Sequence, residues 1–194
     1  MRAAKLALRD QLQTARNRLS PADVQESAAA LTAVVLALAE VRRAATLTAY
    51  VSVGTEPGTG ALIDALADAG KRVLLPVMAP TEGPGWDLDW GLYRGPSSLA
   101  PARFGLLEPV GELLGPEAAA RADVLLVPGM AVSPEGFRMG KGAGCYDRTL
   151  SRVPAGTPTI CLLYPGELDQ PVPIEPHDRP VTAAATAEGL RVFG

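Results

Sequence analysis

The sequence predicts an α/β fold: a single-domain, three-layer α/β/α structure built on an open, mostly parallel sheet. Three observations support this fold class. Strand-like and helix-like segments alternate over residues 45–77, which is typical of parallel α/β proteins. Residues 123–128 include a continuous apolar run, as in a strand covered on both faces. A glycine-rich nucleotide loop and a helix pattern then follow, at the place where open α/β sheets bind ligands.

The first 40 residues are expected to form two helices. Residues 3–19 carry leucines at helical spacing, which predicts an amphipathic helix. Ser20 is a good N-cap and Pro21 suits the first turn, so a second helix is expected from there to about residue 40. The remaining chain reads as alternating strands and helices, and its length fits one domain over residues 1–194.

The later elements are predicted from apolar periodicity and from glycine and proline positions. Strands are expected over 45–53, 72–77, 123–128, 157–164 and 180–186, and helices over 59–69 and 145–153. Residues 87–93 alternate weakly, and 105–109 resemble a turn.

Composition and charge exclude several functional classes. Hydrophobic residues make up 47% and charged residues 20%, as in ordinary globular proteins. A net charge of −3 argues against non-specific nucleic-acid binding, so no nucleic-acid partner is expected. The longest apolar run, 31–39, is too short to span a membrane, and no membrane partner is expected. Two cysteines are too few for a disulfide framework, which favours a cytoplasmic location.

Residues 138–148 are the strongest functional signal. The segment contains three alternate glycines, three cations and a carboxylate: Gly140, Gly142, Gly144, Arg138, Lys141, Arg148 and Asp147. Glycines allow backbone N–H groups to approach an anion, and the N-terminus of the following helix favours negative charge. Lys141 is one of only three lysines against fifteen arginines, which favours a specific role over a solvated loop position. The segment predicts a nucleotide-phosphate loop, although it matches neither the P-loop nor the Rossmann pattern.

The surrounding residues resemble the sequence signature of the 5-formyltetrahydrofolate cyclo-ligase family, also called methenyltetrahydrofolate synthetases. The resemblance covers nearly the whole chain. Its pieces, in order, are Lys5-x-x-Leu8-Arg9, Tyr50-x-Ser52, Glu56-x-x-Thr59, Leu75-Pro76, Glu108-Pro109, Val127-Pro128-Gly129, Gly136-Phe-Arg138-Met-Gly140, Tyr146-Asp147-Arg148 and Glu175-Pro176-His177-Asp178. Cys145 differs from the pattern, since many members carry an aromatic residue there.

The resemblance implies a reaction and its ligands. 5-Formyltetrahydrofolate (folinate) would be cyclised to 5,10-methenyltetrahydrofolate with conversion of ATP to ADP and phosphate, and Mg²⁺ would accompany the nucleotide. Arg138 and Lys141 are the implied catalytic residues. The implied ATP contacts are Lys5, Arg9, Arg138, Met139, Gly140, Lys141, Gly142, Ala143, Gly144, Cys145 and Tyr146. The implied folate contacts are Val51, Glu56, Lys141 and Tyr146, and the implied Mg²⁺ ligands are Asp147 and Asp178.

Several of these residues have a structural alternative. Lys5 and Arg9 lie one helical turn apart and could form a solvated helix face. Glu56 could cap the helix that begins near residue 59. Asp147 could pair with Arg148, and Tyr146 could either stack on the substrate or pack the loop.

The remaining expectations concern aromatic residues, the histidine and rival functions. Trp86 and Trp90 are candidates for contacts to the pterin, and His177 is interpreted as a structural turn residue rather than a base.

Two rival functions are considered. One is a folate- or nucleotide-binding regulatory module; another is a sugar-phosphate isomerase with Glu56 as its base. The complete set of loop cations and carboxylates favours an enzyme. A monomer is expected, with a dimer as the alternative.

Overall fold

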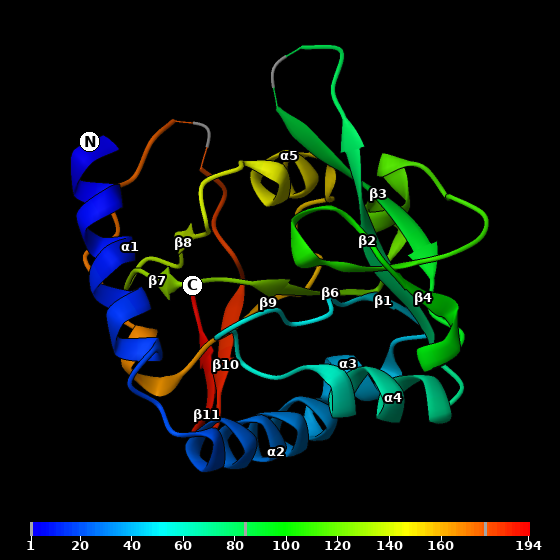
Figure 1. Ribbon diagram of the computed structural model, residues 1–194, viewed down its shortest axis with the longest axis horizontal. Coiled ribbons are helices and arrows are strands. Elements are labelled where there is room, and N and C mark those ends of the chain that lie inside the picture. Colours follow the sequence, from blue (N-terminus) through cyan, green and yellow to red (C-terminus); the bar gives the residue numbers. More distant parts are fainter. Residues whose placement is uncertain (1, 84, 177) are drawn as a thin grey trace.

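The computed structural model describes residues 2–83, 85–176 and 178–194, and in these ranges its centre is a seven-stranded sheet (Figure 1). The strand order is β11-β10-β9-β6-β1-β2-β3. The strands are β1 (Thr46–Thr48), β2 (Arg72–Pro80), β3 (Trp86–Leu92), β6 (Val124–Pro128), β9 (Thr159–Leu162), β10 (Ala183–Thr186) and β11 (Gly189–Val192). Only the edge strands β3 and β11 pair antiparallel to their neighbours, which confirms the mostly parallel sheet.

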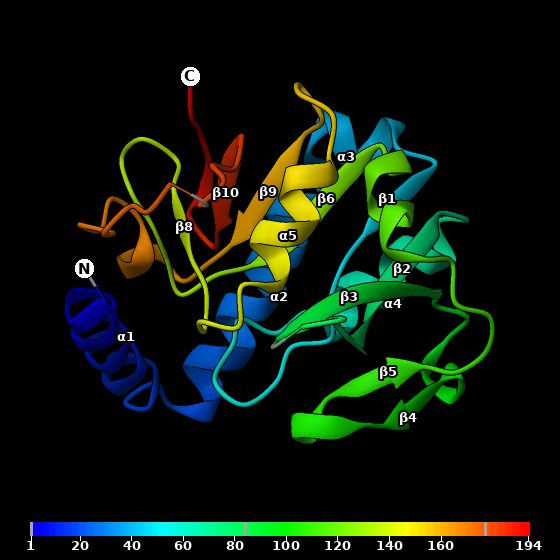
Figure 2. The same ribbon diagram turned by 90° about the horizontal axis from the view of Figure 1, so that it is seen from above.

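Helices cover both faces of this sheet. One face carries α2 (Pro21–Ala37), α3 (Ala39–Arg43) and α4 (Gly60–Asp68), and the other carries α5 (Cys145–Arg152) with the 3₁₀ helix η3 (Pro116–Arg121) (Figures 1 and 2). Helix α1 (Arg2–Arg16) stands apart from these layers, beside the end of the molecule where β7 and β8 lie (Figure 1). The predicted three-layer α/β/α fold is therefore confirmed.

The second helix begins where the sequence predicts. The Ser20 side chain accepts a hydrogen bond from the Asp23 amide at 3.2 Å, and the Asp23 carboxylate accepts one from the Ser20 amide at 3.1 Å. This reciprocal capping box fixes the start of the helix. The expected end near residue 40 is wrong, because Leu38 adopts extended backbone angles that separate α2 from α3.

Strand β6 is buried on both faces, as its apolar sequence predicts. Val124 and Leu126 join the core cluster that includes Leu31 and Leu62 of α2 and α4. Leu125 and Val127 join the opposite cluster, with Leu150 of α5. Alternate side chains of one strand therefore bind both helical layers to the sheet, each contributing about 1.5–3 kcal/mol of burial free energy.

Several short elements differ from the expectations. Strand β7 (Ala131–Val132) and strand β8 (Arg138–Met139) form a hairpin between β6 and the glycine loop. Strands β4 (Leu99–Pro101) and β5 (Leu107–Pro109) pair where a turn was expected, on either side of the 3₁₀ helix η2 (Arg103–Gly105). Two further 3₁₀ helices, η1 (Pro96–Ser98) and η4 (Pro165–Glu167), lie in connections. The expected strand 45–53 is only three residues long, because the chain leaves the sheet after Thr48.

The centre of the sheet contains a topological switch point. Strands β1 and β6 are parallel neighbours. The chain leaves β1 toward α4 on one face and leaves β6 toward α5 on the other (Figure 2). Their carboxyl ends thus diverge and leave a crevice, which is where open α/β sheets bind ligands. Within the described ranges, no helix has the length and apolar character needed to cross a membrane.

Candidate active site

A cavity of about 290 Å³ lies at this crevice. Its walls come from α1, from the segment after β1, from Pro128–Met130 after β6, from the glycine loop and from the segment containing Glu175. The structure brings the sequence-predicted site residues together on its lining: Lys5, Arg9, Val51, Glu56, Arg138, Met139, Gly140, Lys141, Gly142, Ala143, Gly144, Cys145, Tyr146, Asp147 and Asp178. His177 lies outside the described residues.

The glycine loop has a backbone that other residues would not readily adopt. Gly142 has a φ of +106° and Gly144 a φ of +70°, both in the left-handed region that favours glycine. A Cβ on Gly140 would lie 2.6 Å from Nη1 of Arg138. Gly144 is also the N-cap of α5 and provides no side-chain cap. The loop therefore brings bare backbone to the cavity at the start of a helix, which suits an anion.

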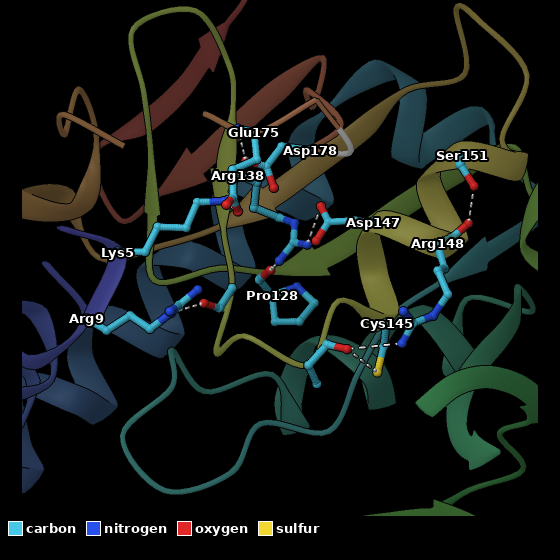
Figure 3. A network of polar contacts seen from close by, with 12 residues as sticks. Lys5, Arg9, Pro128, Arg138, Cys145, Asp147, Arg148, Ser151, Glu175 and Asp178 are labelled. Atoms are coloured by element: carbon cyan, nitrogen blue, oxygen red, sulfur yellow. Dashed lines mark hydrogen bonds and ion pairs between the residues drawn. The ribbon is translucent and has the colours of Figure 1, made fainter. Parts of the chain in front are cut away.

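Arg138 is buried beneath this loop, only 5% exposed. Its Nη1 donates to the Pro128 carbonyl at 3.2 Å and its Nη2 to the Asp147 carboxylate at 3.2 Å (Figure 3). The ring of Tyr146 lies 5.5 Å from Arg138 Cζ, within range of a cation–π contact. Asp147 thus pairs with Arg138, and the alternative pairing with Arg148 is wrong.

Arg148 faces away from the cavity, unlike the other cations of the loop. Its Nη2 donates to the carbonyls of Trp86 and, at 3.0 Å, of Ala143. Figure 3 shows Arg148 beside Cys145, away from Arg138 and Lys5. The thiol of Cys145 donates to the same Trp86 carbonyl over 3.2 Å. Burial raises the pKa of this thiol, so it stays protonated and able to donate. The two side chains attach the loop to β3.

Two cations reach the cavity from α1. Lys5 Nζ donates to Glu175 Oε2 at 2.7 Å and to Asp178 Oδ2 at 2.6 Å (Figure 3). Burial opposes its charge, but the hydrogen bonds to Asp178 and Glu175 outweigh that effect and raise the pKa of Lys5. Arg9 Nε donates to the Gly140 carbonyl at 2.9 Å. The alternative of a solvated helix face is therefore wrong.

A buried ion pair holds α1 in place. Arg16 Nε donates to Glu167 Oε1 at 2.5 Å, and Arg16 Nη2 donates to Glu167 Oε2 at 2.8 Å and to the Gly129 carbonyl at 2.7 Å. The pair joins the helix to η4 and to the end of β6. Leu8 and Leu12 of α1 also pack against Met139 and other residues of the β7–β8 region.

Glu56 lies across the cavity from the glycine loop and pairs with it. Its Oε1 is 2.7 Å from Lys141 Nζ, and its Oε2 accepts a hydrogen bond from the Val53 amide at 2.9 Å. The carboxylate is 9% exposed, whereas the Lys141 side chain is 53% exposed. The alternative role for Glu56, a cap of the following helix, is wrong: the N-cap of α4 is Thr59, its amide donates to Ser52 Oγ at 3.1 Å, and the Glu56 carboxylate contacts Val53 and Lys141 instead.

Sequence reasoning missed Tyr50 as a cavity residue. Tyr50 and Tyr146 both line the cavity, and their hydroxyls are buried with no hydrogen-bond partner among the described residues. Burial raises the pKa of both phenols, so they stay neutral at physiological pH. The available signal was the Tyr50-x-Ser52 motif of the family resemblance, which flanks Val51. The tryptophan candidates do not line the cavity, since Trp90 is in the core and Trp86 packs edge-to-face on Phe104.

The carboxylates of the cavity do not form a ready-made metal cage. In residues 2–83, 85–176 and 178–194, no three His, Cys, Asp or Glu side chains are grouped so that they could hold a metal ion. Asp147 and Asp178 nonetheless both line the cavity, and each accepts a hydrogen bond from a cation. This sparse set fits a Mg²⁺ ion that takes its other ligands from phosphates and water.

Fold and cavity together define the class: an α/β protein whose candidate small-molecule site lies at the switch point of an open sheet. The particular family follows from comparison with known proteins. The chain belongs to the 5-formyltetrahydrofolate cyclo-ligase family, whose model matches residues 1–187.

Individual relatives agree with this assignment. The chain is 46% identical over 142 residues to a 5-formyltetrahydrofolate cyclo-ligase of Mycolicibacterium smegmatis, covering 73% of each chain. It is 31% identical over 172 residues to the Escherichia coli enzyme of that name, covering 88% of this chain and 93% of the other. The solved structure of 5,10-methenyltetrahydrofolate synthetase from Aquifex aeolicus superposes with a TM-score of 0.81 at 27% identity, over 97% and 92% of the two chains.

Proposed function

We propose that this protein cyclises 5-formyltetrahydrofolate to 5,10-methenyltetrahydrofolate, with conversion of ATP to ADP and phosphate. The observation that supports this most is the cavity itself. One space is lined on one side by a cationic glycine loop and on the other by a carboxylate with apolar neighbours. Such a site can hold a polyphosphate and a reduced pterin side by side. The names of the relatives support the folate substrate and the methenyl product, and the cationic glycine loop supports ATP as the second substrate.

The nucleotide would lie against the glycine loop. Backbone amides of 140–144 would contact the phosphates, and Arg138 and Lys141 would balance the negative charge that spreads over the transferring phosphoryl group. Lys5 and Arg9 would approach from α1, and Met139, Ala143, Cys145 and Tyr146 would line the same half. Buried Arg138 is already oriented by Pro128 and Asp147, so little reorganisation is needed.

The folate would lie against the opposite wall. Glu56 can accept hydrogen bonds from the N–H donors of the pterin, and Val51 provides apolar contact beside it. Tyr146 lies between the two halves, with its ring on Arg138. In this arrangement the formyl group points toward Lys141.

The chemistry needs positioning and charge more than acid or base groups. The formyl oxygen attacks the γ-phosphorus and the bond to the β–γ bridging oxygen breaks, releasing ADP. N10 then attacks the formyl carbon, and phosphate leaves with the former formyl oxygen. The attack of N10 closes the ring, and loss of the N10 proton and of the phosphate gives the methenyl product. The cavity contributes by aligning the two substrates and excluding water.

Magnesium would be held by Asp147 and Asp178 together with the phosphates. When bound, it would supply positive charge at the phosphate oxygens. Asp147 and Asp178 lie on the wall that includes Arg138 and Lys5, so both are on the phosphate side of the cavity.

We propose further that residues 1–194 fold as one domain that acts as a monomer in the cytoplasm, with no nucleic-acid or membrane partner. The two cysteines fit this location, since Cys145 and Cys161 are both buried and form no disulfide with each other.

An absorbance assay tests the function. Protein mixed with 5-formyltetrahydrofolate and MgATP should produce the methenyl-folate absorbance, and omission of ATP or addition of excess EDTA should abolish the rise. If both ligands bind without any turnover, the protein is a regulatory module instead. If neither ligand binds, the cavity assignment is wrong as well.

A further inference from the structure

The Lys141–Glu56 ion pair joins the two halves of the cavity. Lys141 belongs to the glycine loop, where the nucleotide is proposed to bind, and Glu56 belongs to the wall proposed for the pterin. Their charged atoms are 2.7 Å apart, and both residues line the cavity. In the proposed function, Glu56 therefore holds the pterin, whereas Lys141 contacts the phosphates and lies near the formyl group.

We infer that this pair couples the binding of ATP and folate, so that each substrate strengthens the binding of the other. The inference rests on the proposed function. A triphosphate in the loop attracts Lys141 and separates it from Glu56. A pterin on Glu56 has the same effect from the other side. The first ligand to bind must break the pair, and the second ligand finds it already broken, which is positive coupling.

The surroundings of Glu56 explain why the pair matters to the folate. The carboxylate is 9% exposed, and in the part of the chain that the structure describes it accepts one backbone hydrogen bond, from Val53, besides its pair with Lys141. Arg16 also interacts with it electrostatically, but is engaged by Glu167. Tyr50 and Tyr146, which lie within its electrostatic influence, are neutral. When Lys141 moves to a phosphate, a largely buried negative charge remains that favours N–H donors.

The loop allows this movement without unfolding. Arg9 donates to the Gly140 carbonyl at 2.9 Å, and its guanidinium also lies beside Gly142. The backbone on both sides of Lys141 is therefore held, while its flexible side chain is 53% exposed. Rotation of side-chain bonds is enough to transfer the ammonium group from Glu56 to a phosphate.

Calorimetry with unreactive ligands tests the coupling. Adenylyl imidodiphosphate with Mg²⁺ replaces ATP, and 5-methyltetrahydrofolate replaces the substrate. In the wild type, saturating folate should tighten nucleotide binding about fivefold, and saturating nucleotide should tighten folate binding by the same factor. A factor of one in the wild type, with both ligands bound, would overturn the inference while leaving the proposed function intact. Absence of binding by either ligand would overturn both.

Substitution of Glu56 gives the more specific result. Glu56→Gln should tighten binding of the nucleotide alone about fivefold, because Lys141 is then available from the start. A folate-site substitution that improved nucleotide affinity would have no explanation in a purely structural role. Unchanged or weaker nucleotide binding would contradict the coupling.

Two controls separate the pair from a general effect of charge. In a Lys141→Met background, Glu56→Gln should leave nucleotide affinity unchanged, since no pair remains to break. Glu112→Gln removes the same charge from an exposed carboxylate that is not part of the cavity lining, and it should bind nucleotide as the wild type does. If nucleotide binding became tighter in either control, the effect would come from the overall electrostatic field of the protein and not from the Lys141–Glu56 pair.

Discussion

Lys141 and Arg138 are the two loop cations on the cavity wall, and they differ in how they are held. Arg138 is buried and fixed by two acceptors, so replacing it changes packing as well as charge. The Lys141 side chain is 53% exposed and makes one ion pair. A substitution of Lys141 therefore tests charge compensation with little effect on stability.

We predict that Lys141→Ala lowers kcat about 100-fold, the size seen when one preorganised charge-stabilising group is removed. The melting temperature should fall by no more than about 4 °C, because the Lys141 side chain is half-exposed, although its loss leaves the largely buried Glu56 carboxylate without this cation. The absorbance assay and thermal unfolding provide these two measurements. Lys71→Ala is a matched control: Lys71 donates to the backbone carbonyls of 42 and 44 and is not part of the cavity lining, so this variant should retain full turnover. Wild-type rates for Lys141→Ala would remove this residue from the mechanism.

Gly129 follows β6 under the cavity and has no room for a side chain. A Cβ at this position would lie 2.4 Å from Sγ of Cys161, which is fully buried. We predict that Gly129→Ala destabilises the protein by about 1–3 kcal/mol through overpacking, measured by chemical denaturation. The double variant Gly129→Ala/Cys161→Ala should recover part of this loss, because it removes the sulfur. A Gly129→Ala protein as stable as the wild type would contradict the packing argument.

For single residues, the sequence predicted which residues belong to the site better than it predicted the directions of their side chains. The glycines and cations of 138–148 indicated an anion site because those residue types serve few other purposes together. Arg148 belongs to the same segment but turns toward Trp86, and nothing in the spacing indicated that direction. Tyr50 was missed because its role as a cavity residue depends on the strand ending after Thr48.

Helix α5 and strand β3 are joined by polar contacts at the base of the loop. Arg152 donates to both carboxylate oxygens of Asp87, at 3.0 and 2.5 Å, and Arg148 contacts the neighbouring Trp86 carbonyl. The Arg152 hydrogen bonds lower the pKa of Asp87 against the opposing effect of burial. The loop is thus fixed at its helical end.

We predict that the stability supplied by Asp87 depends on pH. A carboxyl whose pKa is lower in the folded state stabilises that state above its ordinary pKa, and the contribution is lost as the pH falls through the folded value. Asp87→Asn should therefore lower the free energy of unfolding by about 2 kcal/mol at pH 7. The difference from wild type should shrink below about pH 4, in urea denaturation series. A difference that is constant from pH 7 to pH 3 would exclude this ionic origin.

The longer helices and strands could be predicted from the apolar periodicity and the caps of the sequence, whereas the shortest strands could not. Capping at Ser20 and the apolar run of β6 are local signals, so these elements began where expected. Strands β7 and β8 have two residues each, too few for any alternation to register. Strand β11 is exposed along most of its length, so no apolar pattern marked it.

At the scale of the whole molecule, the cavity is bordered by α1 near the start of the chain and by the segment with Glu175 and Asp178 near its end. Helix α1 is joined through Arg16 to Glu167 and through Lys5 to Glu175 and Asp178. Both members of the Arg16–Glu167 pair are almost inaccessible to solvent, so removal of one leaves the other charge buried and unpaired.

We predict that Arg16→Met destabilises the protein by about 3–5 kcal/mol, whereas Arg16→Met/Glu167→Met costs much less because no lone charge remains. Denaturant titration measures both. The single variant should also bind nucleotide more weakly, since Lys5 and Arg9 share the helix. Equal stability of the single and double variants would show that the pair is not what anchors α1.

The tether of α1 also has a consequence for synthesis. The helix leaves the ribosome well before its acidic partners at 167, 175 and 178, which are translated more than 150 positions later. A growing polypeptide therefore carries the cations of α1 undocked until these partners have emerged, and competence for ligands is acquired only then.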